Sequence, residues 1–95
     1  MQTTLTYQRA PGTVHEVSDG CAVVLDPTGT TMTTLNSIGT IVWEALAEPR
    51  DVDELLGLLA AAHPDTPPAV LEHDIAEFLS DLESKRLVSA ADAGS

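Results

Sequence analysis

The chain has 95 residues, which is enough for one domain with a single core and too few for a second. Its hydrophobic fraction of 43% is ordinary for a folded globular protein and argues against wholesale disorder. Four basic and fifteen acidic residues give a formal net charge of −11, which disfavours nucleic acid and anionic lipid as partners and favours basic ones. Solubility alone is an equally good interpretation of this charge.

The sequence is consistent with a protein of the reducing cytoplasm. Its single cysteine cannot form an internal disulfide. Residues 1–11 contain no apolar signal core, and no stretch is long and apolar enough to span a bilayer. We therefore expect a soluble cytoplasmic protein with no membrane partner.

Composition predicts one folded domain between two flexible ends. Residues 1–12 are polar and finish on a Pro-Gly turn, so we expect a flexible N-terminal arm that forms at most one short extra strand. Residues 13–90 carry the apolar patterns of the domain, and residues 91–95 are expected to be a flexible tail.

Three strands are predicted after the arm. Alternating residues at Val14–Ser18 and Cys21–Asp26, joined by the hairpin dipeptide Asp19-Gly20, indicate an antiparallel pair. A turn with Pro27 and Gly29 leads into Thr30–Leu35, which is rich in β-branched residues. Because consecutive strands tend to pair, the simplest sheet is a meander with the third strand at an edge.

The third strand passes without a loop into the first helix. Asn36 is a favoured N-cap, and apolar residues with helical spacing follow it. Trp43 lies one turn after Gly39, so the missing side chain of the glycine is expected to make room for the indole. A second helix is predicted after Asp51, which forms with Glu54 the pattern of a capping box.

The third helix is expected to begin at a proline. Thr66 is the predicted cap, with Pro67 in the first helical position. Lys85 and Arg86 are placed in the last turn, where cations complement the helix dipole. Its apolar stripe comprises Leu71, Ile75, Phe78, Leu79 and Leu82.

These elements predict an α+β fold, in which a three-stranded antiparallel sheet packs on a three-helix winged helix-turn-helix unit. Residues 87–90 are expected to form a short closing strand.

The sequence contains no constellation typical of an enzyme. Cys21 lies on an apolar strand face, where an inert thiol is favoured over a nucleophile. His73 and Glu77 have the i, i+4 spacing of metal ligands, but without a third ligand a solvated helix face is preferred. We therefore predict no catalysis, no metal and no cofactor.

Duplex DNA is the ligand that a winged helix-turn-helix ordinarily suggests, and charge argues against it here. A recognition helix needs Lys or Arg to meet phosphates and base edges. The third helix instead carries Glu72, Asp74, Glu77, Asp81 and Glu83. We therefore expect no nucleic-acid partner, and a winged-helix transcriptional regulator is the disfavoured alternative.

Two features remain as candidates for binding. The edge strand Thr30–Leu35 contains neither Lys nor Pro, the usual protections of an exposed edge, so an extended peptide could pair with it. A terminus or a second copy of the chain could instead cover the edge. The acidic residues Asp74, Glu77 and Asp81 run beside the apolar stripe of the third helix, although such a run is commonly a solvated face.

The sequence resembles the PqqD-like family of recognition domains for ribosomally made peptide natural products. The resemblance covers roughly Val14 to Ser89 and rests on the pattern Leu35-Asn36-x-x-Gly39-x-x-Val42-Trp43-x-x-Leu46. It continues through Asp51-Val52-x-Glu54-Leu55-Leu56 and Asp74-Ile75-x-x-Phe78-Leu79-x-x-Leu82, and it closes on Leu87-Val88.

The resemblance implies a site for the leader of a precursor peptide. The leader would add as an antiparallel strand to the third strand, in the groove between that strand and the third helix. Backbone pairing would fall to Thr30, Thr31, Met32, Thr33, Thr34 and Leu35. Val23, Leu25 and Met32 would add apolar contacts, and the helix side would be lined by Val70, Asp74, Ile75, Phe78 and Leu82.

Small discrete members of this kind occur in lasso-peptide pathways, where they hand the leader to a separate cysteine leader peptidase or other modifying enzyme. The acidity and the polar arm favour this type, because both suit capture of a Lys-rich leader. The alternatives are a peptide chaperone for a radical-enzyme pathway such as pyrroloquinoline quinone biosynthesis, and a self-associating scaffold module.

Overall fold

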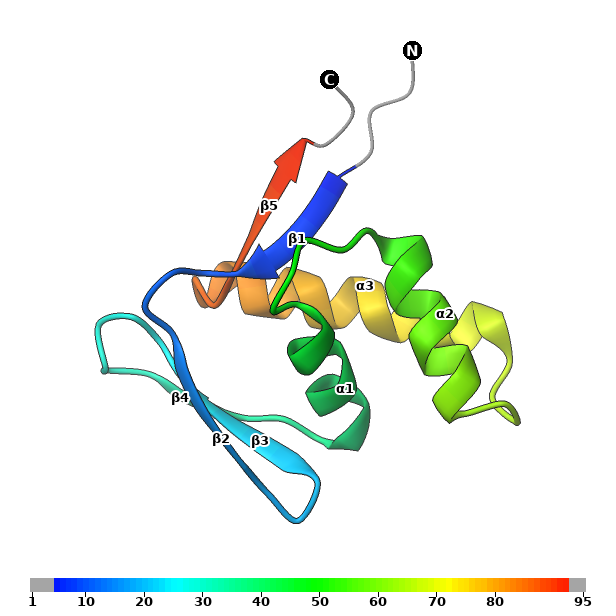
Figure 1. The fold of residues 1–95 in the computed structure, drawn as a ribbon, viewed down its shortest axis with the longest axis horizontal. Helices are drawn as coiled ribbons and strands as arrows, with labels where there is room; N and C mark the ends of the chain where they lie inside the picture. Colours follow the sequence, from blue (N-terminus) through cyan, green and yellow to red (C-terminus); the bar gives the residue numbers. More distant parts are fainter. Residues whose placement is uncertain (1–4, 93–95) are drawn as a thin grey trace.

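The computed structural model describes residues 5–92 (Figure 1). In chain order the elements are β1 (Leu5–Arg9), β2 (Val14–Ser18), β3 (Cys21–Leu25), β4 (Met32–Thr34), α1 (Ser37–Ala45), α2 (Val52–Ala62), α3 (Pro68–Ser84) and β5 (Val88–Asp92). The predicted α+β fold, with a three-stranded sheet and three helices, is confirmed. Within these residues no helix is long and apolar enough to cross a membrane.

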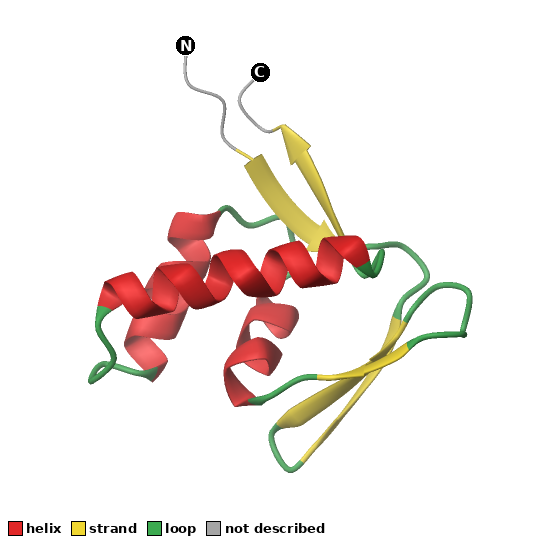
Figure 2. Ribbon diagram, turned by 180° about the vertical axis from the view of Figure 1, so that it is seen from behind, coloured by secondary structure: helices red, strands yellow, loops and turns green. Residues whose placement is uncertain are grey.

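The three-stranded sheet has the order β2-β3-β4, so β4 lies at an edge as predicted. Asp19 and Gly20 both adopt positive φ, 53° and 77°, which matches the tight turn expected between β2 and β3. Side chains alternate between the faces of β3, and Ala22 and Val24 are fully buried on the face that packs on the helices. One face of the sheet therefore belongs to the core, and the other faces away from it (Figure 2).

A second sheet joins the two ends of the described chain. β1 pairs antiparallel with β5. Tyr7 also exchanges two backbone hydrogen bonds with Arg50, in the loop between α1 and α2, at 2.7 and 2.9 Å. β1 is thus the one short extra strand that the sequence allowed in the N-terminal arm, whereas residues 91–92 of the expected flexible tail are paired strand. Residues 1–4 of the arm and 93–95 of the tail lie outside the described residues.

The predicted caps of the first two helices are confirmed. The Asn36 side-chain oxygen accepts the backbone N–H of Gly39 at 2.7 Å. Asp51 accepts the N–H of Glu54 at 2.8 Å, and the Glu54 carboxylate accepts the N–H of Asp51 at 3.1 Å, which completes the capping box. Both devices use hydrogen bonds between residues three apart, so the local sequence was sufficient to predict them.

The predicted ends of α3 were wrong by one or two positions. Pro67 occupies the N-cap position, Pro68 is the first helical residue, and no side chain caps the helix, so Thr66 does not have the expected role. At the other end, Lys85 and Arg86 lie beyond the last helical residue. Arg86 adopts a φ of 62°, and the N–H of Leu87 bonds to the carbonyl of Leu82 at 2.9 Å. This Schellman-type ending normally uses glycine where Arg86 stands.

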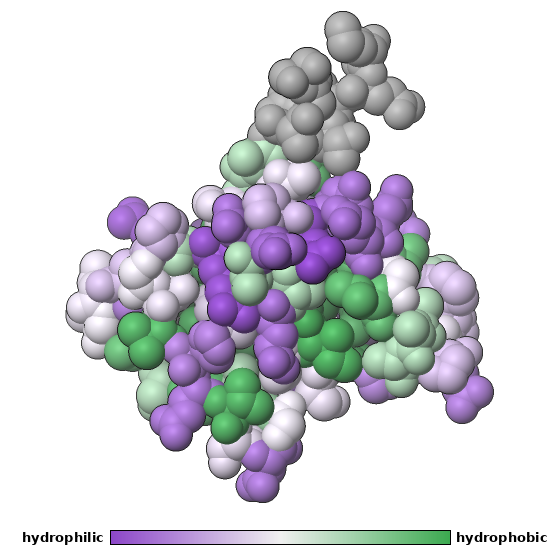
Figure 3. Space-filling view, viewed as in Figure 1, coloured by the Kyte–Doolittle hydropathy of each residue, from purple (hydrophilic) through white to green (hydrophobic). Residues whose placement is uncertain are grey.

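Trp43 is the largest fully buried side chain of the core. The Arg9 guanidinium lies 5.1 Å from the centre of its ring, and the His15 ring meets it edge-on at 5.9 Å. Apolar residues from all three helices and from β3 and β5 pack around it. On the surface, apolar side chains form separate patches among hydrophilic ones (Figure 3).

Candidate functional site

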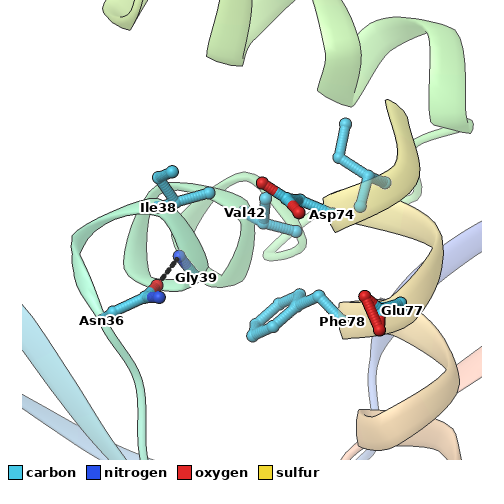
Figure 4. Close-up of a pocket in the computed structure, with 8 residues that line it drawn as sticks. Asn36, Ile38, Gly39, Val42, Asp74, Glu77 and Phe78 are labelled. Carbon is cyan, nitrogen blue, oxygen red and sulfur yellow. Dashed lines mark hydrogen bonds between the residues drawn. The ribbon is translucent and has the colours of Figure 1, made fainter. Parts of the chain in front are cut away.

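A cleft of about 210 Å³ opens between the first half of α1 and the middle of α3 (Figure 4). Both helices contribute to its wall, and its lining residues are Asn36, Ile38, Gly39, Val42, Asp74, Ile75, Glu77 and Phe78. The lining combines buried apolar residues, such as Val42 and Ile75, with the exposed polar residues Asn36 and Glu77, so it could contact both an apolar and a polar group of a ligand.

Gly39 of α1 and Phe78 of α3 face each other in the cleft. A Cβ atom added at Gly39 would lie 2.8 Å from Cε1 of the phenyl ring, closer than real Cβ atoms approach, and 3.2 Å from Cζ. The glycine therefore makes room for Phe78 of α3, and the expectation that it makes room for Trp43 was wrong. In Figure 4 the ring of Phe78 reaches from α3 toward the backbone of α1 at Gly39.

Side-chain hydrogen bonds hold α1 in place beside the sheet. The buried Thr40 hydroxyl accepts the backbone N–H of Ala22 in β3 at 2.8 Å, and the N–H of Leu35 bonds to the Ala22 carbonyl at 2.7 Å. These bonds fix the angle between β4 and α1, which follow each other in the chain. They thereby also fix the position of β4 relative to the cleft.

Two arginines bind the C-terminal end of α1. Arg9 Nε donates to the carbonyl of Trp43 at 2.9 Å, and Arg50 Nε donates to the carbonyl of Ala45 at 3.2 Å. Cations are favourable at a helix C-terminus, where carbonyl groups lack intrahelical partners. Partial burial lowers the pKa of Arg9, and the nearby Glu44 carboxylate opposes that shift. A guanidinium nevertheless remains charged at neutral pH.

The outer edge of β4 offers a short row of free backbone groups. Hydrogen bonds join Leu35 to Ala22 and Asp26 to Thr31, and Thr33 lies opposite Val24 between them. Because bonded and non-bonded pairs alternate in an antiparallel ladder, the N–H and C=O groups of Met32 and Thr34 point away from β3. An added strand could pair with these groups.

Before β4, the Asp26 carboxylate already occupies backbone N–H groups that a longer edge strand would offer to a peptide. Its Oδ1 accepts the backbone N–H groups of both Thr30 and Thr31, at 2.9 and 3.0 Å. The bond to Thr31, followed by one from the Thr28 hydroxyl, lowers the pKa of Asp26. Thr30 and Thr31 therefore belong to the turn, and the edge strand is shorter than the predicted Thr30–Leu35.

The sequence-predicted site residues of the sheet do not reach the cleft. Val23, Leu25 and Met32 share the outer face of the sheet with Val14 and Glu16, around a separate shallow depression of about 220 Å³. Side chains alternate along a strand, and the core face of β3 is already taken by its buried residues. Met32 is 69% exposed and lies on the free edge strand, so of the three it is the most accessible.

The helix residues divide into three groups. Asp74, Ile75 and Phe78 line the cleft as expected. Val70 is 48% exposed and lies one turn before Asp74, outside the cleft lining, while Leu82 is fully buried in the core. The cleft also contains residues that the sequence did not place in the site, namely Asn36, Ile38, Gly39 and Val42 of α1 and its approach, and Glu77 of α3.

The titratable residues of the cleft, Asp74 and Glu77, both come from α3. Glu77 forms an ion-pair contact with His73 at 3.0 Å on the exposed side of α3. Among residues 5–92, no group of three His, Cys, Asp or Glu side chains could hold a metal ion. Cys21 is half-buried on the outer sheet face and is not in the cleft.

Comparisons with solved structures show that the fold is shared with known proteins. Over 93% of this chain and 96% of the other, the fold matches the structure described as TbiB1 in complex with the TbiA(beta) leader peptide, with a TM-score of 0.76 and 23% identity. It also matches the solution structure of the PqqD truncation of Methylobacterium extorquens PqqCD, described as a stand-alone recognition element for ribosomally synthesised and post-translationally modified peptides. That match covers 88% of each chain, with a TM-score of 0.72 and 21% identity.

No curated protein matches the sequence. The family model for coenzyme PQQ synthesis protein D (PqqD) matches residues 21–88, which run from the start of β3 to the start of β5 and include every residue of the cleft. The chain therefore belongs to the PqqD family.

Proposed function

We propose that this protein binds the leader segment of a ribosomally made precursor peptide, without catalysing a reaction itself. The observation that carries the proposal is the free edge of β4, which is followed two residues later by Asn36 in the wall of a cleft with mixed apolar and polar lining. A peptide in extended conformation could hydrogen-bond to Met32 and Thr34 and direct alternate side chains toward Phe78. Family membership, and a structural neighbour whose description names a bound leader peptide, support this proposal.

Apolar contacts should supply most of the free energy of peptide binding. One well-buried aliphatic or aromatic side chain contributes about 1.5–3 kcal/mol. The few backbone hydrogen bonds available at β4 contribute about 0.5–1.5 kcal/mol each. The net charge of −11 acts chiefly on the association rate of a basic peptide. The hydrogen bonds to β4 should therefore fix the register of the bound peptide, and the cleft should determine which peptide sequences bind.

We further propose that the pathway is one that makes a lasso peptide, and that the bound leader is passed in the cytoplasm to a separate cysteine leader peptidase or other modifying enzyme. The strong acidity favours a Lys-rich leader, as such a pathway could supply. A peptide chaperone for a radical-enzyme pathway, such as pyrroloquinoline quinone biosynthesis, is the alternative, and it uses the same cleft.

A fluorescence-polarisation titration tests the binding step. The probes are labelled leader segments of short precursor genes that neighbour this gene, and each is paired with a copy whose apolar residues are replaced by Ser. We expect a Kd of 1 μM or tighter, about −8 kcal/mol, for one probe and loss of binding for its Ser copy. Equal binding of both copies would contradict an apolar anchor.

Two variants separate the edge from the cleft. Thr34→Pro removes an N–H that points away from β3, so the sheet should tolerate it while an added strand should not. Phe78→Ala removes the largest apolar wall of the cleft. We expect each to weaken binding at least tenfold, while Leu58→Ala, on the exposed side of α2, should leave it unchanged.

The same free edge could pair with a second copy of the chain. Light scattering at several protein concentrations, with and without the peptide, distinguishes this outcome. A dimer that dissociates when peptide binds would mean that both partners use β4, and a dimer unaffected by peptide would place self-association elsewhere.

A further inference from the structure

Asp74 differs from Glu77 and Asp81 because it has no partner within the described residues, and from Glu72 because it is half-buried and lines the cleft. Glu77 contacts His73, and Asp81 accepts from Lys85 at 3.0 Å, each along the exposed side of the helix. Asp74 is half-buried, and its carboxylate points across the cleft toward α1 (Figure 4). No hydrogen bond or ion pair to it is formed by residues 5–92.

The cations of the chain are elsewhere. Arg9 binds the carbonyls at the end of α1, Arg50 pairs with Glu48 and Glu54, and Lys85 pairs with Asp81. The fourth basic residue, Arg86, follows the end of α3 and does not line the cleft. No basic residue lines the cleft. A carboxylate beside apolar side chains is partly shielded from water, so its attraction for a cation is stronger there than on an open surface.

We propose that the cleft selects peptides that carry a Lys or Arg close to their apolar anchor, and that Asp74 binds this cation. The inference rests on the proposed peptide binding and adds the chemistry of its ligand. The occupant is an extended peptide paired with β4, whose apolar side chain contacts Phe78 and whose cation contacts Asp74.

The spacing of the two groups follows from the geometry of strands and helices. Asp74 and Phe78 are one helical turn apart on α3, and side chains with that spacing are separated by about 5–6 Å. Alternate side chains of an extended strand, which point to the same side, are about 6.6–6.8 Å apart. For a peptide whose strand runs alongside α3, the cation should therefore lie two residues from the apolar anchor.

A selection from random peptides tests the proposal without a known ligand. Displayed twelve-residue peptides are enriched separately on wild-type protein, on Asp74→Asn and on Glu72→Gln. Glu72 is an exposed residue of α3 outside the cleft, so its variant changes the net charge by the same amount. Wild type and Glu72→Gln should enrich an apolar residue with Lys or Arg two positions away, and Asp74→Asn should enrich the apolar residue alone.

The outcomes separate this inference from the proposed function. If wild type enriches no peptide, the proposed peptide binding itself fails. If wild type enriches an apolar motif without a cation, or if Asp74→Asn enriches the same cation, peptide binding stands and the role of Asp74 is refuted.

A thermodynamic cycle with one enriched, synthesised peptide completes the test. Replacing its cation by Gln should weaken binding to wild type about five- to tenfold and binding to Asp74→Asn less than twofold. Exchange of Lys for Arg in the peptide keeps the positive charge, so affinity for the wild-type protein should be preserved. This comparison uses only wild-type protein, so it tests the role of charge even if Asp74→Asn folds poorly. Equal losses with wild type and Asp74→Asn would overturn the proposed pair.

Discussion

Replacement of Gly39 by Ala probes the contact that forms the cleft. Two effects oppose each other in this variant. Ala is favoured over Gly inside a helix by about 1 kcal/mol. The new methyl group would lie 2.8 Å from Cε1 of Phe78, and overpacking of this kind costs about 1–3 kcal/mol. The net result should be a loss of about 0–2 kcal/mol in the free energy of unfolding.

The sign of the effect should change when the phenyl ring is absent. In a Phe78→Ala background the methyl group no longer meets the ring, and only Oδ1 of Asn36, 3.2 Å away, stays close to it, so Gly39→Ala should stabilise the protein by up to about 1 kcal/mol. The coupling between the two sites should therefore be about 1–3 kcal/mol. Urea unfolding followed by the fluorescence of Trp43, the single tryptophan, measures all four proteins of the cycle.

Gly57 supplies the matched control. It lies inside α2, and a Cβ atom added there would meet nothing within 4 Å. Gly57→Ala should therefore stabilise the protein by about 1 kcal/mol whichever residue occupies position 78. If Gly39→Ala behaves like Gly57→Ala in both backgrounds, the close packing of α1 on α3 is refuted.

Three further changes test other contacts. Arg86→Gly should stabilise the protein by about 0.5–1 kcal/mol, because glycine relieves the left-handed backbone at the end of α3, whereas Arg86→Ala should not; thermal unfolding compares them. Thr40→Val should destabilise by about 1–3 kcal/mol in urea unfolding, because the buried N–H of Ala22 loses its acceptor, and an unchanged midpoint would show that water replaces the hydroxyl. The pKa of Asp26 is lowered in the folded protein, so its contribution to stability is present above the unfolded-state pKa and is lost as pH falls through the folded-state value. Urea unfolding between pH 2 and about 6 should show this dependence diminished in Asp26→Asn; an identical pH profile would refute it.

Features that depend on near neighbours could be predicted from the sequence. The cap at Asn36, the capping box at Asp51 and the hairpin at Asp19-Gly20 each involve residues at most three positions apart. The apolar stripe predicted for α3 also corresponds to its buried face, because the period of the helix determines which residues share a face.

Features that depend on which elements meet could not be predicted in the same way. The pattern around Gly39 showed that a side chain was missing, but the ring that fills the space comes from another helix, far along the chain. In β3 both faces are apolar, so alternation alone did not show that Ala22 and Val24 face the core. The strand at Leu5–Arg9 is stabilised by distant partners and carries only a weak local pattern.

The pairing of β1 with β5 has a consequence for how this domain can be combined with others. Leu5 lies opposite Asp92, so the chain enters and leaves the described fold through neighbouring positions in one ribbon. That ribbon contributes no residue to the cleft. A domain with adjacent ends can be inserted into a loop of another protein, or joined to one at either end, without separating the elements that form its site.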